Sequence, residues 1–406
     1  MRKWKTLWWV SVSQVFALSL WFSTSVIIPE LEKIWAFDSF VENFITAAVP
    51  VGFALGALVS SSLGLADKFN ARSIFSVCAI VGALLNGCII FAQSPLQVVF
   101  LRFLTGIALA GIYPISVKFI SQWYQNQKGF AIGTLIGAVT LGSSLPHLIR
   151  VFFYGIDWRL IVTASSILSL CAAFIIYFVV EDAPDSSKQS VFSIKLLKNV
   201  VNNKPVMLSN YGYFGHMWEL YAMWTWIPIF LTYSFQSQLP SFPAWATSLA
   251  VFGIIGVSGA IGCIFGGWIA DYIGPSNLTI IAMTISAFCS LIIGFTFGQS
   301  IWITISVASI WGIFIIADSA QFSAIISNFA DTEYVGTALT FQMAIGFLIT
   351  VISINLIPFM VRFTTWEWVF PALSIGPILG IVSMLQLKKY EVKKVQNIGE
   401  VNQLQT

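Results

Sequence analysis

Long apolar runs with almost no charge are the feature that most constrains this chain. Only 9% of its 406 residues are charged, whereas 57% are hydrophobic. A soluble domain carries roughly 25% charged residues, so most of this chain cannot cover a water-facing surface. A helix needs about 20 mainly apolar residues to span a bilayer, and the sequence has room for about a dozen such spans. Lipid is therefore the solvent for most of the chain.

The runs favour an all-α membrane protein with twelve transmembrane helices. A membrane β-barrel would need short segments of alternating polarity, whereas these runs stay apolar for twenty residues or more. The predicted spans lie near residues 7–29, 41–64, 73–93, 97–119, 129–153, 159–180, 206–232, 244–270, 276–298, 300–327, 335–361 and 367–386. Basic residues precede the first run as in a signal peptide, but no small-residue cleavage site follows, so we interpret it as an uncleaved span.

The longest polar interruption divides the spans into two groups of six. We predict an N-terminal six-helix bundle at 1–180, a cytoplasmic linker at 181–205, a C-terminal six-helix bundle at 206–386 and a cytoplasmic tail at 387–406. With the N-terminus inside, fifteen of the 20 Lys and Arg residues fall on the cytoplasmic side. Four lie outside and Arg102 lies within a span. This asymmetry predicts that both termini are cytoplasmic, and the short loops suit a bacterial inner membrane.

Several other classes of protein are disfavoured by what the sequence lacks. A net charge of +3 is too small to indicate a nucleic-acid partner. The five cysteines form no CxxC pair, so neither a metal site nor a disulfide framework is expected, and no cofactor is indicated. The chain has only two histidines and no HExxH motif, and it contains no phosphate-binding loop. An enzyme and an ATP-driven pump are therefore both disfavoured.

The two halves of the sequence resemble each other, and both resemble the major facilitator superfamily. Leu65-Ala66-Asp67-Lys68 follows the second span, and Ile269-Ala270-Asp271 follows the eighth, 204 positions later. The first copy is similar to that family's G-x-L-A-D-R-x-G-R-R signature, with Leu63 and Asn70 in place of glycines and Ala71 in place of an arginine. The resemblance covers essentially the whole chain. It implies two six-helix bundles with pseudo-twofold symmetry and a site between them near the membrane midplane.

This signature implies a gating role for its charged residues, which are Asp67, Lys68, Arg72 and Asp271. A carboxylate at the start of a helix is favoured by the helix dipole, and a pair between the halves would hold one conformation and break in the other. An ordinary charged turn is the alternative.

Arg102 begins an Arg-x-x-x-Gly pattern in the fourth span that is also similar to the family's. The resemblance associates this arginine with proton transfer or anionic substrates. Within lipid it needs a partner such as backbone carbonyls or a carboxylate, unless it reaches the outer interface. Gly133, Gly137 and Gly142 in the fifth span predict close helix packing, and they resemble the family's antiporter signature too loosely to indicate antiport.

Three ionisable residues fall deep within the second six spans. His216 and Glu219 are three positions apart and share one face of the seventh span, and Asp318 lies within the tenth. Ionisable groups at such depth are functional hypotheses by default. We expect them to carry coupling protons, together with Arg102. A structural bond between His216 and Glu219 is the alternative.

Weaker candidates line a predicted substrate cavity between the halves. They are Gln14, Trp21, Tyr113, Met223, Trp226, Gln321 and Gln342. The sequence thus predicts a monomeric secondary transporter that moves a small solute by alternating access with proton coupling. A facilitator without coupling and a sensor or scaffold that no longer transports share the same pattern and stay open.

Overall fold

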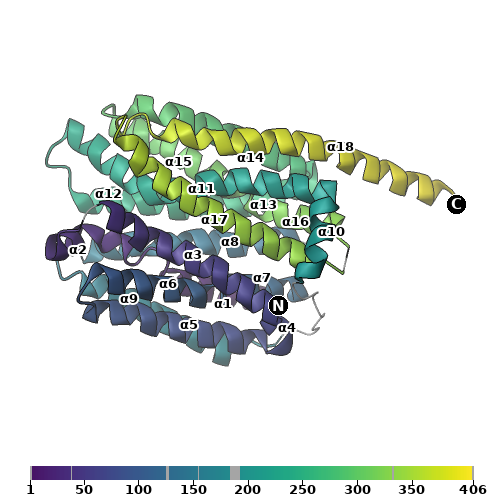
Figure 1. The fold of residues 1–406 in the computed structure, drawn as a ribbon, viewed down its shortest axis with the longest axis horizontal. Helices are drawn as coiled ribbons and strands as arrows, with labels where there is room; N and C mark the ends of the chain where they lie inside the picture. The colour runs from purple at the N-terminus through teal and green to yellow at the C-terminus, as the bar shows by residue number, and fades with distance from the viewer. Residues whose placement is uncertain are drawn as a thin grey trace.

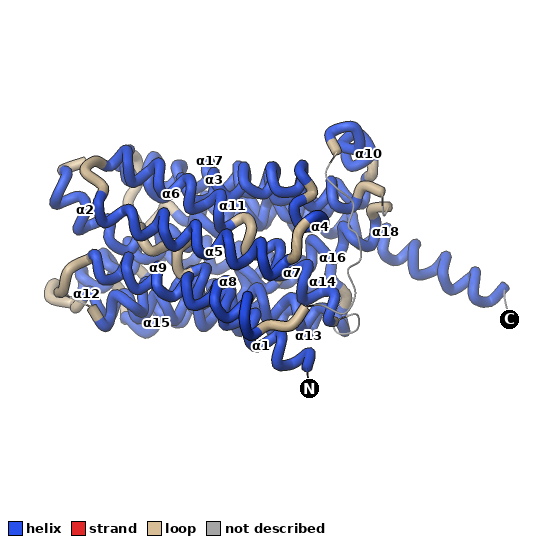
Figure 2. Tube along the Cα trace, turned by 90° about the horizontal axis from the view of Figure 1, so that it is seen from below, coloured by secondary structure: helices blue, strands red, loops and turns tan. Residues whose placement is uncertain are grey.

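The computed structural model describes residues 2–37, 39–124, 128–153, 155–182, 193–331 and 333–404, and every secondary-structure element in these ranges is helical. Helices from the first part of the chain lie on one side of the bundle and those from the second part on the other (Figure 1). Both chain termini lie at the same end, which we call the terminal face, and α18 extends beyond the bundle there (Figures 1 and 2).

The N-terminal half contains the helices up to residue 180. Its elements are α1 (Arg2–Leu18), η1 (Ser25–Ile27), α2 (Ile28–Trp35), α3 (Ser39–Leu63), α4 (Leu65–Lys68), α5 (Ala71–Cys88), η2 (Ile89–Phe91), α6 (Pro95–Leu109), α7 (Tyr113–Trp123), α8 (Lys128–Phe152), α9 (Arg159–Phe174) and η3 (Ile175–Val179).

The C-terminal half follows η4 (Ile194–Leu196) and α10 (Leu197–Asn202). Its elements are α11 (Lys204–Gln238), α12 (Ala244–Val251), η5 (Phe252–Ser258), α13 (Gly259–Ile273), α14 (Pro275–Ile292), η6 (Ile293–Thr296), α15 (Ile301–Ala317), α16 (Ser319–Phe329), α17 (Val335–Val361), η7 (Phe370–Ser374) and α18 (Ile375–Leu404).

Local sequence signals explain where several helices begin. The Asn70 side chain accepts hydrogen bonds from the backbone N–H groups of Arg72 and Ser73, which caps α5. Asn203 caps α11 in the same way through the N–H of Val206. Proline occupies the first turn of α2, α6, α7, α11 and α14, where its missing N–H is not needed.

Ten helices in the described residues are long and apolar enough to cross a membrane, against the twelve that the sequence predicts. The remaining two long helices are α1 and α11, which pack alongside those ten. α1 has 17 residues and begins with basic side chains. α11 has 35 residues, and buried polar side chains such as Asn210, His216 and Glu219 lower its apolar character. These polar groups belong to the site described below.

Three interruptions break long helices inside the bundle. α1 stops at Leu18, and the chain is non-helical up to η1. α6 and α7 are separated at Ala110–Ile112, where Pro114 cannot donate a hydrogen bond back to the preceding turn. α15 and α16 are separated at Asp318. The last two breaks lie at matching places in the two halves, so the internal repeat predicted from sequence extends to helix irregularities.

The halves contact each other closely where α8 meets α13. A Cβ atom on Gly133 would lie 2.6 Å from the carbonyl oxygen of Cys263, and one on Gly267 would lie 2.6 Å from that of Gly129. Gly142 instead packs against the backbone of α1 at Val15. The predicted close packing of the glycines in this span is therefore confirmed, and two helices from different halves approach to backbone contact.

Candidate functional site

A buried histidine–carboxylate pair lies inside the C-terminal half. His216 comes from α11 and Asp318 from the break between α15 and α16, and the ring Nδ1 lies 2.9 Å from Oδ1. Each side chain is only 2% exposed. The contact lacks the direction of a well-formed hydrogen bond, and the second ring nitrogen, Nε2, has no hydrogen-bond partner among the described residues. His216 Nε2 can therefore take a further hydrogen-bond partner.

Glu219 lies one turn further along α11 and is held separately. Its Oε2 accepts a hydrogen bond of 2.6 Å from the hydroxyl of Ser286 on α14, and its Oε1 accepts one of 2.9 Å from the indole Nε1 of Trp311 on α15. The residue is 2% exposed. Two neutral donors satisfy a carboxylate, and the serine hydroxyl can rotate to accept a proton from a carboxylic acid. Sequence spacing suggested a contact between His216 and Glu219, whereas each has a partner on another helix.

Aromatic rings from both halves meet where α3 and the interrupted segment after α1 face α11 and α17. Trp21 lies 5.3 Å from Tyr221 and 6.0 Å from Phe347 between ring centroids, and Phe53 lies 4.6 Å from Phe347. These four residues, which we call the interface aromatic cluster, are all less than 9% exposed. Sequence reasoning identified only Trp21, because a phenylalanine or tyrosine within an apolar span does not stand out from its neighbours.

Arg102 binds the interrupted part of the first span. Its Nη1 donates to the carbonyl oxygen of Leu20 at 2.8 Å, and its Nη2 donates to that of Trp21. The side chain is 1% exposed, and it forms no ion pair within the described ranges. Of the partners considered from sequence, backbone carbonyls are the ones present. They are the groups that the broken helix leaves unpaired.

A polar network continues from this break into the N-terminal half. The hydroxyl of Ser23 donates to Asn86 Oδ1 at 2.6 Å, and Asn86 Nδ2 donates to Ser166 Oγ at 3.0 Å and to the Val162 carbonyl at 3.2 Å. These bonds connect the first, third and sixth spans. Sequence analysis did not identify them, because single Ser and Asn residues are common in apolar helices.

The remaining residues that were predicted to line a substrate cavity make different kinds of contact. Gln14 is fully buried, and neither its Nε2 nor its Oε1 has a partner among the described residues. Gln342 accepts a hydrogen bond of 3.4 Å from Ser323, while its Nε2 is unpaired there. Trp226 donates to the Ile354 carbonyl at 2.9 Å, which places it in the packing of the C-terminal half.

Three candidates make packing contacts or lie near the helix breaks. Met223 is fully buried in the main hydrophobic core, and Tyr113 is partly buried and packs against that core. Gln321 is 5% exposed, and its backbone N–H donates to the Asp318 carbonyl at 2.9 Å. Gln321 is therefore bonded to one member of the ionisable pair through its backbone.

In the first copy of the loop signature, Arg72 binds the chain that follows η3. Arg72 Nε and Nη2 donate to the two oxygens of Asp182, at 2.7 and 2.6 Å, and its Nη1 donates to the Val180 carbonyl. Partial burial raises the pKa of Asp182, but the hydrogen bonds from Arg72 and Asn70 outweigh this and hold that pKa below its ordinary value. The pair therefore joins the start of α5 to the chain after η3.

The structure describes the other residues of the signature to different extents. Lys68 is exposed. The side chain of Asp67 lies outside the described residues. In the second copy, Asp271 lies at the end of α13 beside the first turn of α8, where a Cβ on Gly129 would be 2.7 Å from Oδ1. A carboxylate there is favoured by the exposed N–H groups at the beginning of α8, and this contact connects the two halves.

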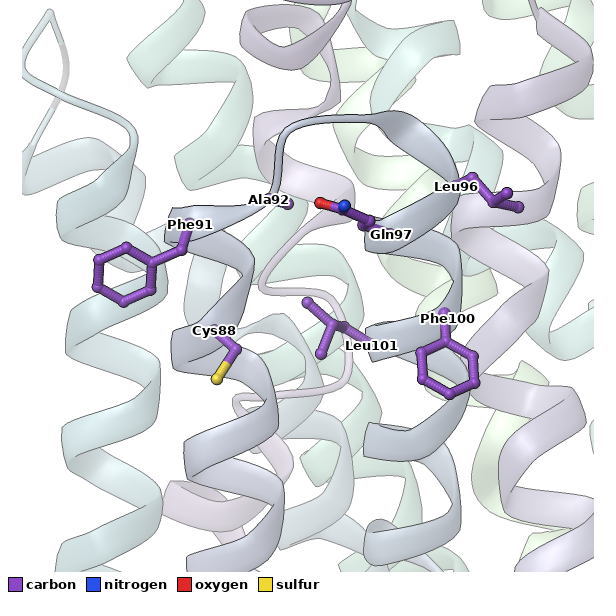
Figure 3. Close-up of a pocket in the computed structure, with 7 residues that line it drawn as sticks. All are labelled: Cys88, Phe91, Ala92, Leu96, Gln97, Phe100 and Leu101. Carbon is purple, nitrogen blue, oxygen red and sulfur yellow. The ribbon is translucent and has the colours of Figure 1, made fainter.

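An apolar pocket lies away from these residues, at the end of α5, in η2 and at the beginning of α6 (Figure 3). It is lined by Cys88, Phe91, Ala92, Leu96, Gln97, Phe100 and Leu101. Phe91 and Leu96 are 79% and 77% exposed. The pocket is thus a shallow groove on the apolar outer surface and does not belong to the site between the halves.

Comparison with known proteins agrees with the twofold helical architecture. The chain is 23% identical to the benzoate transport protein of Acinetobacter baylyi, covering 94% of this chain and 89% of that protein. It is 22% identical to a gallate transporter of Pseudomonas putida, over 79% and 77% of the two chains. Its fold is similar to the crystal structure of the nucleoside transporter NupG, with a TM-score of 0.72, 14% identity, and coverage of 95% and 100%.

The family model of the Major Facilitator Superfamily matches residues 10–354, which is most of the chain. Transporters of small solutes make up the relatives named above, and the fold, the apolar helices and the repeat agree with them. The protein is therefore a multi-pass membrane transport protein rather than an enzyme, and it belongs to the Major Facilitator Superfamily.

Proposed function

We propose that this protein is a proton-coupled secondary transporter that moves a small solute by alternating access between its two halves. The observation that carries the proposal is the buried His216–Asp318 pair, with Nδ1 and Oδ1 2.9 Å apart and both side chains 2% exposed. Placing an ionisable side chain in the membrane interior costs free energy, so such residues usually mark functional sites.

Proton binding at the His216–Asp318 pair would change the charge of the site, and it would also change the conformation of the helix break beside it. Asp318 is the residue immediately before α16, at the break between α15 and α16, and its side chain makes no capping hydrogen bond there. Protonation of Asp318 would remove its attraction to a protonated His216. The break between α15 and α16 is the element that would respond. Glu219 supplies a second buried carboxyl group that contacts α15 through Trp311.

Alternating access needs contacts between the halves that can form and separate. In the α8–α13 contact, Gly133 and Gly267 approach carbonyl groups of the other half directly, so no side chains interlock at those two positions. Between α3 and α17, the hydroxyls of Ser61 and Thr340 lie 2.7 Å apart. Both contacts involve the helix ends near the terminal face, which supports a state closed on that side.

We place the transporter in a bacterial inner membrane as a monomer, with the terminal face in the cytoplasm. The asymmetry of Lys and Arg supports this orientation. A facilitator without coupling and a transport-inactive sensor are the competing functions. The sensor is the weaker alternative, because a scaffold gains nothing from three buried ionisable groups.

Proton movement in proteoliposomes that contain a pH-sensitive dye tests the proposal. Purified protein would be supplied with radiolabelled solutes, including benzoate, nicotinamide, uridine and glucuronate. We expect solute-dependent proton flux in the wild type and loss of that flux, at least tenfold, in Asp318→Asn, His216→Gln and Glu219→Gln. Glu333→Gln, an exposed carboxylate in the loop before α17, serves as the matched control.

Each alternative gives a different result. Solute uptake without proton flux in the wild type would indicate a facilitator. Proton flux that persists in all three variants would move coupling to other groups. Binding of a solute without uptake, in protein that is folded by size-exclusion chromatography, would favour the sensor.

A further inference from the structure

We infer that Tyr213 is a positioning residue that connects the His216–Asp318 pair to an aromatic gate between the two halves. This inference rests on the proposed transport function and adds the route by which proton binding acts on the contact between the halves. Each step of the route is a side-chain contact. The pair contacts Tyr213, Tyr213 contacts α17, and α17 carries one of the rings of the gate.

The gate is the interface aromatic cluster, whose rings form three contacts across the halves. Trp21 packs against Tyr221 at 5.3 Å and against Phe347 at 6.0 Å between ring centroids, and Phe53 packs against Phe347 at 4.6 Å. The rings are buried and packed against one another, so the halves are closed against each other at this level. Alternating access requires the halves to separate, and these three contacts are then lost.

The contacts within each half indicate where the gate parts. Trp21 packs against Phe53 of its own half at 5.5 Å, and Tyr221 packs against Phe347 of its own half at 5.4 Å. Arg102 binds the carbonyl oxygen of Trp21, which keeps that residue with the N-terminal half. The plane of separation therefore runs between two ring pairs, Trp21–Phe53 on one side and Tyr221–Phe347 on the other.

Tyr213 lies between the ionisable pair and the helix that carries Phe347. Its ring lies 6.0 Å from the imidazole of His216. It also contacts α17 so closely that a Cβ atom on Gly346 would clash with the ring. Gly346 directly precedes Phe347 on that helix. Packed interiors have few voids that could absorb movement, so a displacement of Tyr213 toward α17 displaces the backbone that carries Phe347.

The helix break reaches the same tyrosine through a second ring. Phe322 lies on α16, four residues after Asp318, and it is fully buried. Its ring lies 5.6 Å from that of His216 and 5.8 Å from that of Tyr213. The three rings therefore contact one another. A change in the break on proton binding reaches Tyr213 both through His216 and through Phe322.

Few ionisable groups surround the pair, so a pH response can be assigned. Asp318 interacts electrostatically with Glu219 of α11 and with Cys263 of α13, and α7 and α11 contribute tyrosines nearby. Helices α14, α15, α16 and α17 contain no charged residue. Thiols and phenols ordinarily titrate above about pH 8. A response at lower pH therefore belongs to His216, Asp318 or Glu219.

Distances between spin labels test whether proton binding acts on the gate. Labels at Gln93→Cys and Gln299→Cys, in a chain whose five native cysteines are replaced by alanine, would be measured by double electron–electron resonance in nanodiscs. Both residues are exposed, and they follow the third and ninth spans, which places them on the face opposite the termini.

We expect two label distances in the parent chain, one for each state of the gate. Their ratio should change by about threefold or more between about pH 8 and pH 5. Asp318→Asn should abolish this change. Phe347→Leu removes two of the three contacts across the halves, so it should favour the longer distance at every pH by about threefold or more.

Variants at the tyrosine separate a positioning role from a structural one. Tyr213→Leu removes the ring, so it should abolish the pH-dependent change while the protein still unfolds cooperatively. Tyr213→Phe keeps the ring and should retain the change. Phe235→Leu is the matched control, because Phe235 is also buried on α11 but its ring contacts Phe242 within the same half. This control should respond to pH like the parent chain.

Three results would overturn the inference. One is a pH-dependent change in Tyr213→Leu equal to that of the parent chain, since the ring would then transmit nothing. Another is an unchanged distance distribution in Phe347→Leu, since the rings would not hold the halves together. The third is solute-dependent proton flux in proteoliposomes without any effect of pH on the label distances, which leaves the proposed function standing. Absence of proton flux with every solute counts against the proposed function itself.

Discussion

Side chains in the described part of this protein hydrogen-bond to the backbone more often than to other side chains. Arg102 illustrates this, because a buried guanidinium usually suggests a buried carboxylate, yet its two terminal nitrogens bind the carbonyls of Leu20 and Trp21. A planar group with two parallel donors fits two consecutive carbonyls, whereas an ammonium group presents one point charge. Arg102 therefore stabilises a helix break through hydrogen bonds to the backbone, rather than pairing with a buried carboxylate.

Replacing Arg102 should test that interpretation. Arg102→Lys keeps the charge and loses the double contact, and Arg102→Met loses both contacts. Hydrogen bonds to a charged group contribute about 1.5–3 kcal/mol each, so both variants should unfold at a lower temperature, Arg102→Met by more. Thermal unfolding in detergent measures this. Arg159→Met removes an exposed arginine paired with Asp157 and serves as control. Equal stability of Arg102→Met and the control would contradict the assignment.

At the scale of elements, the halves meet through helices with very small side chains. Gly133 of α8 leaves no room for a methyl group against the Cys263 carbonyl, whereas a Cβ on Gly253 would meet no atom within 4 Å. Gly133→Val should therefore force α8 and α13 apart, and Gly253→Val should not.

Overpacking at such a contact costs about 1–3 kcal/mol, so thermal unfolding in detergent measures the difference between the two variants. The unfolding temperature should fall in Gly133→Val relative to the parent protein and change little in Gly253→Val. Equal unfolding temperatures of the two variants would mean that α8 and α13 accommodate a side chain at Gly133 without cost.

The contact between Arg72 and Asp182 is an element-level connection with a definite pH dependence. The folded-state pKa of Asp182 lies below its ordinary value, so the contribution of the pair is present above the unfolded pKa of about 3.9. It is lost as pH falls through the folded pKa. The carboxylate is half exposed, which limits the effect to about 1 kcal/mol or less.

Asp182→Asn should therefore lower the unfolding temperature slightly at pH 7, and the difference from wild type should shrink below about pH 4. Arg72→Gln should behave alike, and the double variant should be no less stable than either single one. Additive losses would show that the two side chains stabilise the fold through separate contacts.

At the scale of the whole molecule, the sequence predicted the helical class, the repeat and the family, because apolar length and motif spacing are properties of the chain itself. The sequence also placed His216, Glu219 and Asp318 inside the bundle, because these residues lie within long apolar runs. It could not predict their partners. Spacing of three along one helix suggested that His216 contacts Glu219, but tertiary packing brings Asp318 to the first and Ser286 and Trp311 to the second. Neither serine nor tryptophan is distinctive in an apolar segment.

Both termini lie at one end of the bundle (Figure 1), and the distribution of basic residues predicts that this end faces the cytoplasm. Reporter fusions test the orientation. Alkaline phosphatase, which needs an oxidising compartment, should be inactive when fused at either terminus, and green fluorescent protein should fluoresce at both. The opposite pattern at both ends would invert the assigned orientation, and different results at the two ends would contradict the shared face.

The interrupted first helix also constrains how the protein is made. Arg102 follows Trp21 by 81 residues, so the guanidinium that binds the Leu20 and Trp21 carbonyls is synthesised long after they enter the membrane. Until then the Leu20 carbonyl can accept a hydrogen bond from the Ser23 hydroxyl of the same span. The two contacts from Arg102 form only once the fourth span lies beside the first. The mature helix break therefore depends on a residue that is added to the chain well after the break itself.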